Sequence, residues 1–224
     1  MVSKSDNFLF IKSIDKISQE AWNDCVGLDH PFTRYEFLYA LEKSGSAVNS
    51  TGWQPFHYIE MNKDQRIVAI CPLYIKSHSF GEYIFDHVWA DAYHRYGSEY
   101  YPKLQSAIPF TPVTGERIII HKDENNIKKI KKKVLKNIIN KAHTLNVSSL
   151  HFNFLHDHQD ITSENDNFLL RQGIQFHWKN KNYESFDQFL ENLSSRKSKV
   201  IKKERTCIKK NNLTIKLLIG NEIQ

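Results

Sequence analysis

The sequence predicts an α/β protein in which helices cover a mixed sheet, and three patterns favour this class. Apolar residues recur at three- and four-residue steps over residues 127–142, which is typical of a helix with one buried face. Residues 67–75 form a nearly continuous apolar run, as expected of a strand buried on both faces. Helix and strand patterns then alternate from residue 130 to residue 178, the order of an α/β layer fold.

Capping and turn residues place the elements of the first half of the chain. Ser18 is a suitable N-cap, and Thr33 with Glu36 has the spacing of a capping box. Pro72 indicates a bulge or an edge position within a strand. In chain order, the expected elements are a strand at residues 8–11, a helix at 18–22, a helix from 33 to a stop at 44–45, and a strand pair at 53–61 and 66–75.

The elements after residue 95 follow from the same rules. In chain order, they are a short helix at residues 96–104, a strand with an irregular middle at 109–120, a helix from 127, a strand at 150–155, a helix at 163–171 and a strand at 174–178.

The last forty residues have a different organisation. Ser185 and Gln188 form a second capping box, which opens a short helix. Residues 194–211 then predict a helix with eight Lys and Arg against the single acid Glu204, and residues 213–219 predict one strand. Two helices and one strand cannot close a core. We therefore expect one domain at residues 1–183 and the beginning of an incomplete second domain at residues 184–224.

Composition is that of a globular protein. The chain has 224 residues, of which 40% are apolar and 25% charged. No apolar run is long enough to span a bilayer, and the first residues lack a signal-peptide pattern. Three distant cysteines favour neither a disulfide framework nor a zinc site, so we expect a cytoplasmic protein. The formal charge is +6, with basic clusters at residues 128–136 and 196–210.

Residues 76–117 form the most distinctive block of the chain, because large aromatic rings and titratable side chains are interleaved there. The rings are Phe80, Tyr83, Phe85, Trp89, Tyr93, Tyr96, Tyr100, Tyr101 and Phe110, and the titratable residues are His78, Glu82, Asp86, His87, Asp91, His94, Lys103 and Arg117. A pocket wall carries both kinds of side chain. A tyrosine-rich core segment with solvated charges at its edges is the alternative, and composition does not separate the two.

Several catalytic motifs are missing, which leaves general acid–base chemistry. The sequence has no zinc-ligand spacing, no Gly-x-Ser-x-Gly turn, no Walker loop and no Gly-x-Gly-x-x-Gly turn. Acyl transfer to an amine needs a base, donors for an oxyanion and a site for the acyl carrier. The candidate bases are His78, Glu82, Asp86 and Asp91. Tyr101 or Lys103 could protonate a leaving group, and the backbone of residues 111–115 could supply N–H donors.

Several segments resemble one known family. They are residues 37–45, 52–55, 72–93, 100–105, 109–115 and 194–197. The chain resembles the bacterial predicted N-acyltransferases related to the FemAB peptidoglycan aminoacyltransferases, within the GNAT-like superfamily. The resemblance implies two GNAT-like halves, each a mixed sheet with helices on both sides, and transfer of an acyl or aminoacyl group to an amine.

The block and the resemblance together give a set of candidate substrate-binding residues. They are Tyr83, Trp89, Tyr101, Lys103, Phe110, Thr111, Thr114, Gly115, Arg117, Arg196 and Lys197. No metal and no bound cofactor are expected. The donor would be acyl-CoA or aminoacyl-tRNA, so tRNA is a candidate partner, and the acceptor would be a small-molecule or peptide amine.

The chain departs from the family in two ways. Family members run beyond residue 224, so we expect one complete half and the start of a second. The acetyl-CoA signature Arg/Gln-x-x-Gly-x-Gly/Ala is missing. The alternative function is a non-catalytic basic binding module or an inactive truncated product.

Overall fold

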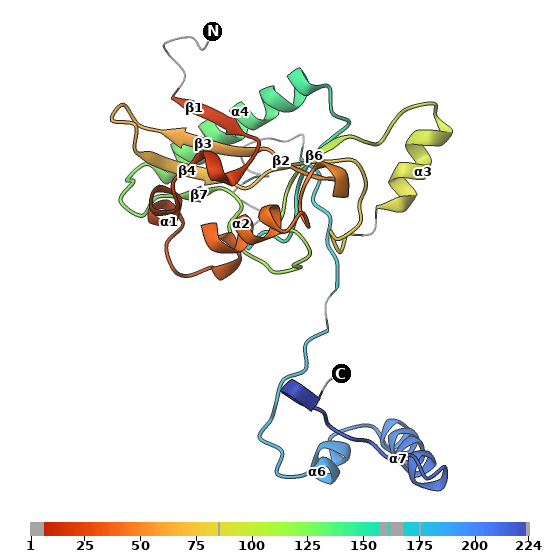
Figure 1. The fold of residues 1–224 in the computed structure, drawn as a ribbon. Helices are drawn as coiled ribbons and strands as arrows, with labels where there is room; N and C mark the ends of the chain where they lie inside the picture. The colour runs from red at the N-terminus through yellow and green to blue at the C-terminus, as the bar shows by residue number, and fades with distance from the viewer. Residues whose placement is uncertain (1–6, 85, 157–160, 162–167, 175, 223–224) are drawn as a thin grey trace. The chain divides into compact units, whose positions relative to one another are not determined.

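The computed structural model describes residues 7–84, 86–156, 161, 168–174 and 176–222. The chain forms two units, which divide between Arg171 and Gln172. In its described residues the first unit has two four-stranded sheets with helices packed on them, which confirms the predicted α/β class (Figure 1). The predicted domain boundary between residues 183 and 184 stays a prediction.

The two sheets share one hairpin that passes from one sheet into the other. The first sheet has the order β1-β3-β4-β7, all antiparallel, with β1 Phe8–Ile11, β3 His57–Met61, β4 Ile67–Cys71 and β7 Ile119–Ile120. The second sheet has the order β2-β5-β6-β8, with β2 Trp53–Pro55, β5 Tyr74–Lys76, β6 Lys103–Ser106 and β8 Leu150–Phe152. Strands β6 and β8 are parallel, and the other pairs are antiparallel.

The hairpin is interrupted where it changes sheets. Residues 53–61 were expected to form one strand, but Phe56 separates β2 from β3. Pro72 and Leu73 separate β4 from β5 in the same way, as the proline indicated, because its backbone has no N–H to donate. The Phe56 backbone N–H donates to the Leu73 carbonyl oxygen at 2.8 Å, so one hydrogen bond joins the two halves across the break.

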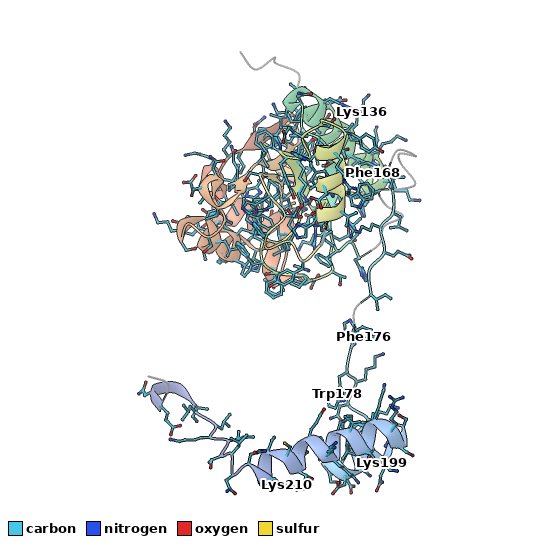
Figure 2. The ribbon with its side chains drawn as sticks, turned by 90° about the vertical axis from the view of Figure 1, so that its right-hand side faces the viewer. Lys136, Phe168, Phe176, Trp178, Lys199 and Lys210 are labelled. Carbon is cyan, nitrogen blue, oxygen red and sulfur yellow. The ribbon has the colours of Figure 1, made fainter. Side chains whose placement is uncertain are left out.

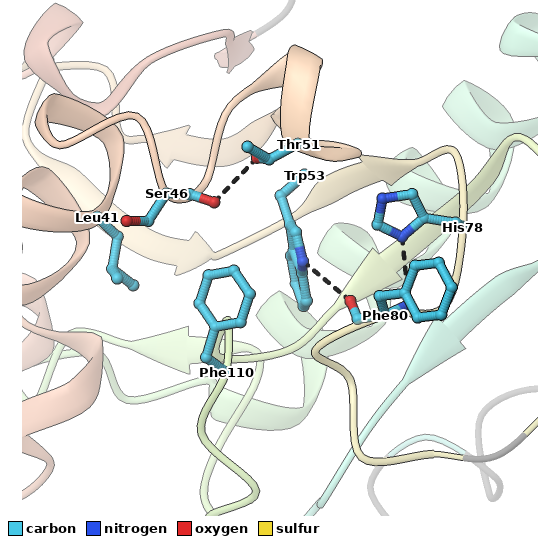
Figure 3. A pocket seen from close by; sticks show the side chains of 7 residues that line it. All are labelled: Leu41, Ser46, Thr51, Trp53, His78, Phe80 and Phe110. Atoms are coloured by element: carbon cyan, nitrogen blue, oxygen red, sulfur yellow. Dashed lines mark hydrogen bonds between the residues drawn. The ribbon is translucent and has the colours of Figure 1, made fainter.

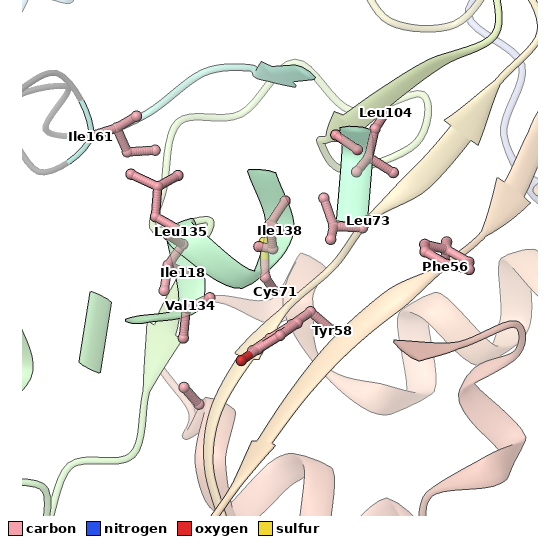
Figure 4. Close-up of a cluster of buried hydrophobic side chains, with 12 residues drawn as sticks. Phe56, Tyr58, Cys71, Leu73, Leu104, Ile118, Val134, Leu135, Ile138 and Ile161 are labelled. Carbon is pink, nitrogen blue, oxygen red and sulfur yellow. The ribbon is translucent and has the colours of Figure 1, made fainter. Parts of the chain in front are cut away.

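Helices cover both faces of the first sheet. On one face, α1 Gln19–Val26 and α2 Tyr35–Lys43 bury Trp22 and Leu38 against Ile59 and Ile70. The long helix α4 Ile127–Leu145 covers the other face. The buried members of this second cluster are Phe56, Tyr58, Ala69, Cys71, Leu73, Leu104, Ile118, Val134, Leu135, Ile138, Ala142 and Ile161 (Figure 4). Burial on both faces explains why the sequence of β4 is apolar throughout.

The capping analysis was right at Ser18 and wrong at Thr33. The Ser18 hydroxyl accepts from the Ala21 backbone N–H at 3.2 Å, and the helix runs on past residue 22 to Val26. The N-cap of α2 is Arg34. Thr33 ends a short 3-10 turn instead, where its hydroxyl donates to the His30 carbonyl oxygen at 2.9 Å. Its side chain is therefore not available to cap α2.

The expected helix at residues 96–104 is also wrong. The helix of this region is α3 His87–Arg95, and Gly97, with φ 72°, follows its end. Lys103 and Leu104 belong to strand β6. Of the expected strand at 109–120, only Ile119–Ile120 forms a strand, and Gly115 makes an isolated bridge to Leu155. Aromatic residues fit either element type, which is why their pattern misled the prediction.

The second unit holds α6 Phe186–Glu191 and α7 Ser195–Lys210, close to the predicted bounds. The Ser185 hydroxyl accepts from the Gln188 N–H at 3.2 Å, as the second capping box predicts. The described residues of the expected strands at 174–178 and 213–219 form no strand and are exposed, because no described strand lies beside them to pair with. The expected helix at 163–171 falls mostly outside the described residues.

We expect Ile138→Ala to lower the free energy of unfolding by about 2–5 kcal/mol, because it leaves a cavity at a fully buried position of α4. Ile127→Ala makes the same chemical change on the same helix, where the side chain is 50% exposed, and should change stability by about 1 kcal/mol or less. Urea unfolding followed by circular dichroism measures both. Equal losses would contradict the packing described for α4.

Candidate active site

Two lysines lie opposite each other at the centre of the second sheet. Lys76 ends β5, Lys103 begins β6, and the two are cross-strand partners in the antiparallel register. Both side chains are fully buried. Like charges directly opposite each other destabilise a sheet. The fold therefore needs anions beside this pair, and the loop that follows β5 supplies Glu82 and Asp86.

The Lys103 ammonium is fully hydrogen-bonded by this loop. It donates to Glu82 Oε2 at 2.8 Å, to Asp86 Oδ2 at 2.6 Å and to Ser79 Oγ at 3.0 Å. These three bonds use all three protons of the ammonium group. A cation at the start of β6 thus fixes the loop at three points. We call Lys76, Ser79, Glu82, Asp86 and Lys103 the ion cluster.

Polar neighbours complete the ion cluster. The Tyr100 hydroxyl donates to Asp86 Oδ2 at 2.8 Å, and the Ser79 and Tyr101 hydroxyls lie 2.7 Å apart. Gln105, with its amide nitrogen turned toward Glu82, donates to both carboxylate oxygens at 2.9 and 3.2 Å. Asp86 Oδ1 is buried and, among the described residues, has no hydrogen-bond partner. Tyr101 is the half-buried member of this group, and its hydroxyl is joined to the ion cluster through Ser79.

The pKa values of the two carboxyl groups are shifted in opposite directions: that of Asp86 is lowered and that of Glu82 is raised. Burial would raise the pKa of Asp86, but the hydrogen bond and charge of Lys103 and the hydrogen bond from Tyr100 outweigh it and lower the pKa to about 2. Burial raises the pKa of Glu82, and the nearby lysines offset only part of this effect. Asp86 is therefore the permanent anion of the ion cluster. Glu82 is the carboxylate closer to accepting a proton at neutral pH.

Lys76 is the less well satisfied of the two lysines. Its ammonium donates to the Gly52 carbonyl oxygen at 3.0 Å and lies 3.8 Å from Glu82 Oε1. It also lies 3.6 Å from the centre of the Trp53 ring, a cation–π contact. Burial, and secondarily the charge of Lys103, lowers the pKa of Lys76 to about 7. This lysine can thus lose its proton near neutral pH.

An open pocket of about 510 Å³ has Trp53 among its lining residues, and Figure 3 shows Trp53 between Phe110 and His78. Its lining residues are Leu41, Ser46, Thr51, Trp53, His78, Phe80 and Phe110. The Trp53 indole N–H donates to the Phe80 carbonyl oxygen at 3.2 Å. The volume is in the range of small-molecule sites.

Two glycines let the pocket wall approach the backbone closely. Gly81 has φ 77°, and a Cβ there would lie 2.6 Å from the Phe110 ring. Gly52 has φ 72°, and a Cβ there would lie 2.2 Å from His78 Nε2. Phe110 itself has φ 59°, a conformation that non-glycine residues rarely adopt. Such strain is held only where the surrounding structure over-determines it, and it is common at ligand sites.

The structure brings part of the predicted site together. Glu82, Asp86 and Lys103 meet in the ion cluster, and Tyr101 reaches it through Ser79. The carboxylates do not line the pocket; they are buried, with Lys76 between Glu82 and Trp53. The interleaved block therefore contributes Phe80 and Phe110 to a pocket wall. Its Glu82, Asp86 and Lys103 are buried, and not solvated at the edges of a core as in the alternative interpretation.

Two predicted pocket residues, His78 and Phe110, do line the pocket, but His78 is poorly placed as a base. Its Nδ1 accepts from the Phe80 backbone N–H at 3.2 Å. Its Nε2 faces the backbone at Gly52. Burial, and then the charge of Lys76, lowers the pKa of His78, so the ring is neutral at pH 7. Both ring nitrogens are occupied by the loop, and His78 holds the wall in place.

The remaining candidates lie elsewhere in the first unit or in the second. Tyr83 is exposed, and Trp89 and Asp91 are exposed on α3. Arg196 and Lys197 are exposed on α7, in the second unit.

The candidates at residues 111–117 have backbone partners. The Thr114 carbonyl oxygen contacts His30 Nε2 at 3.2 Å, and the Thr111 hydroxyl donates to the Pro109 carbonyl oxygen at 3.1 Å. Gly115 bridges to Leu155.

Arg117 is fully buried, and its guanidinium donates to the carbonyl oxygens of Val113 at 2.6 Å and Asn153 at 2.8 Å. These bonds give Arg117 the role of holding the loop to β8.

Sequence reasoning missed Trp53, Lys76, Ser79, Tyr100 and Gln105. One signal was present: Lys76 and Lys103 each stand next to an apolar strand residue, and two carboxylates follow within ten residues of Lys76. A lysine in a buried strand must be paired, so this pattern can indicate a buried ion cluster. The described residues contain no group of acids, histidines or cysteines that could hold a metal. They also contain no helix long and apolar enough to cross a membrane.

We expect Lys76→Met to flatten the pH dependence of stability between pH 7 and pH 10. The folded chain releases the Lys76 proton near pH 7, whereas the unfolded chain keeps it up to about pH 10.5. Within this window the unfolded state binds more protons, so the contribution of Lys76 to the unfolding free energy rises with pH, by at most about 1.4 kcal/mol per unit.

Urea unfolding at half-unit steps of pH measures this difference between the wild type and Lys76→Met. The exposed Lys128→Met is the control and should give a curve parallel to the wild type. Parallel curves for Lys76→Met as well would show that Lys76 stays charged in the folded chain.

Comparison with known proteins identifies the family of this chain. No curated protein matches it. Two solved structures are similar: the aminoglycoside 6'-N-acetyltransferases AAC(6')-Ih of Acinetobacter baumannii, with a TM-score of 0.43 and 14% identity, and AAC(6')-IG of Acinetobacter haemolyticus, with 0.41 and 10%. Each alignment covers 78% of this chain and 97% or 98% of the other. The FemAB-like family of peptidoglycan biosynthesis/recognition matches residues 13–224. The chain therefore belongs to the FemAB-like family.

Proposed function

We propose that this protein is an N-acyltransferase that moves an acyl or aminoacyl group from an activated donor onto an amine. Membership of the FemAB-like family over residues 13–224 is the observation that carries the proposal. The site supports it in two respects: the aromatic pocket can hold a reactant, and the ion cluster beneath it can assist proton transfer. The donor would be a co-substrate such as acyl-CoA or aminoacyl-tRNA.

The reaction has a simple balance of bonds and protons. The neutral amine nitrogen attacks the carbonyl carbon of a thioester or ester, and a C–N bond forms. The C–S or C–O bond to the carrier then breaks. The carrier leaves as a thiol or an alcohol, with the proton that the amine gave up. The enzyme must therefore receive one proton, supply one proton and stabilise one oxyanion.

The proposed roles follow from the hydrogen bonds. Lys103 has only protons to donate, so the Ser79 oxygen accepts from it. Ser79 can then donate its own proton to the Tyr101 oxygen, which leaves the Tyr101 proton free to donate outward. We assign Tyr101 as the donor to the oxyanion or to the leaving group. Glu82, with its raised pKa, is the proposed proton acceptor.

The second unit supports a second candidate function, that of a basic binding module. Residues 172–224 contain eleven Lys and Arg and five Asp and Glu, so they carry the whole formal charge of +6. Lys199 and Lys210 are among the side chains that project from α7 (Figure 2). A helix of this charge would bind a polyanion. If that polyanion is aminoacyl-tRNA, the binding module would hold the donor of the proposed N-acyltransferase.

We expect Tyr101→Phe to lower kcat by about 10²-fold or more, because it removes only the hydroxyl that donates toward the substrate. Its effect on stability should be about 1 kcal/mol. Tyr96→Phe is the control, because this ring is 88% exposed and has no contact with the ion cluster. Turnover is measured with acyl-CoA and aminoacyl-tRNA donors against a panel of amines. Absence of turnover with every pair would contradict the enzyme proposal, and equal kcat for Tyr101→Phe and the wild type would contradict the role of Tyr101.

We expect binding of total tRNA to weaken steeply with salt if α7 binds a polyanion, because each phosphate contact releases counterions. Replacing Lys202, Lys203 and Arg205 by Ala should lower the affinity and reduce the slope of log K against log salt by about 2–3. Replacing Lys128, Lys129 and Lys136 of α4 is the matched control. Filter binding at 50–300 mM KCl measures both; an affinity that is flat with salt would exclude the binding-module function.

A further inference from the structure

The pocket beside Trp53 offers no charged partner to a ligand. Of its lining residues, only His78 is titratable, and the loop occupies both of its ring nitrogens. The carboxylates of Glu82 and Asp86 are buried and bonded to Lys103. An ammonium group or a phosphate in this pocket would lose water without gaining an ion pair, which is costly.

The wall of the pocket has an apolar part, formed by Leu41, Trp53, Phe80 and Phe110, beside the polar residues Ser46, Thr51 and His78. Phe80 is 69% exposed and Phe110 is 40% exposed, so each ring presents much of its surface outward. The Trp53 ring lies 5.5 Å from Phe110 and is fully buried, and Leu41 is half-buried. Covering Phe80, Phe110 and Leu41 with an apolar ligand would remove their exposed surface from water, which is the main source of affinity for such a ligand.

Trp53 offers no free face to a cation. Lys76 lies 3.6 Å from the centre of the Trp53 ring and occupies one face of that ring. The Trp53 side chain is fully buried, so its ring is not available to the ammonium of an aminoacyl group. Lys76 is fully buried, so it cannot pair with an anion in the pocket either.

We propose that the pocket of Trp53, Phe80 and Phe110 binds the uncharged hydrocarbon chain of the acyl group, so that the transferred group is a fatty acyl chain and not an aminoacyl group. This inference rests on the proposed N-acyltransferase function and specifies its donor. The acyl chain lies against the exposed rings of Phe80 and Phe110, and its carbonyl end points out of the pocket. The absence of a Cβ at Gly81 leaves room for the Phe110 ring on this wall.

Binding of S-acyl-N-acetylcysteamines tests the inference without turnover. Isothermal titration calorimetry compares the acetyl, butanoyl, hexanoyl, octanoyl and alanyl thioesters. We expect affinity to rise about two- to fourfold for each added methylene until the pocket is filled. The alanyl thioester, which carries an ammonium, should bind no better than the acetyl thioester. Affinity that does not depend on chain length, or tighter binding of the alanyl thioester, would overturn the inference.

Paired variants locate the binding to this pocket. Phe80→Ala and Phe110→Ala should each weaken octanoyl binding about tenfold or more and leave acetyl binding nearly unchanged, and Phe110→Leu should restore most of the affinity. Gly81→Ala should also weaken octanoyl binding, because its Cβ would displace the Phe110 ring. Gly97→Ala is the control: its φ is also positive, at 72°, but no atom lies within 4 Å of the added Cβ. Equal effects of the two glycine variants would contradict the pocket assignment.

Turnover measured with the same series of donors separates this inference from the proposed function. If kcat/KM for any amine acceptor is the same from acetyl to octanoyl donors, the enzyme proposal stands and the acyl-chain inference falls. If no donor is turned over but binding increases with chain length and depends on Phe80 and Phe110, the pocket assignment stands and the catalytic proposal falls.

Discussion

The site depends on one buried ammonium group. Lys103 stands in the middle of the second sheet, and its three protons bind Glu82, Asp86 and Ser79. Removing one partner of a buried ion pair is expensive, typically about 3–5 kcal/mol, because the other charge stays buried. The loop after β5 is therefore tied to β6 through this group. Its position determines where Phe80 and Gly81 lie, and Asp86 also places the start of α3.

The same arrangement separates the ionic part of the site from its apolar part. Trp53 belongs to both parts: it contacts the Lys76 ammonium and is one of the residues that line the pocket. The charged side chains of the ion cluster are not among those lining residues. Tyr101, through Ser79, is the connection by which the ion cluster can reach a reacting group. The net positive charge of the second unit lies on α7. The salt dependence of tRNA binding tests the role of this helix separately.

Much of the fold could be predicted from local patterns. The periodicity of apolar residues in α4 and the apolar run of β4 were sufficient to predict a helix and a strand, because each pattern reflects which side chains are buried. The errors arose where tertiary contacts decide the outcome. Thr33 has a capping sequence but bonds to His30, and residues 96–104 contain aromatic side chains that fit a helix or a strand. The break of the hairpin at Phe56 has no local signal, because it reflects the change from one sheet to the other.

The part of the sequence that holds the candidate site could be predicted, but the spatial arrangement of its residues could not. The interleaved rings and charges between residues 76 and 117 indicated it, and Glu82, Asp86, Lys103 and Phe110 belong to it. Sequence could not show that Lys76 and Lys103 are cross-strand partners, since register depends on pairing between distant segments. Nor could it show that Asp91 is exposed, because this depends on how α3 packs on the rest of the unit.

The most direct measurement of the central claim is the 1H–15N correlation spectrum of the lysine side-chain ammonium groups at neutral pH. The account predicts a Lys103 Nζ signal whose protons exchange slowly with water, because all three are buried and hydrogen-bonded, and which disappears in Lys103→Met. A Lys103 ammonium that exchanges as fast as those of exposed lysines such as Lys128 would contradict the account.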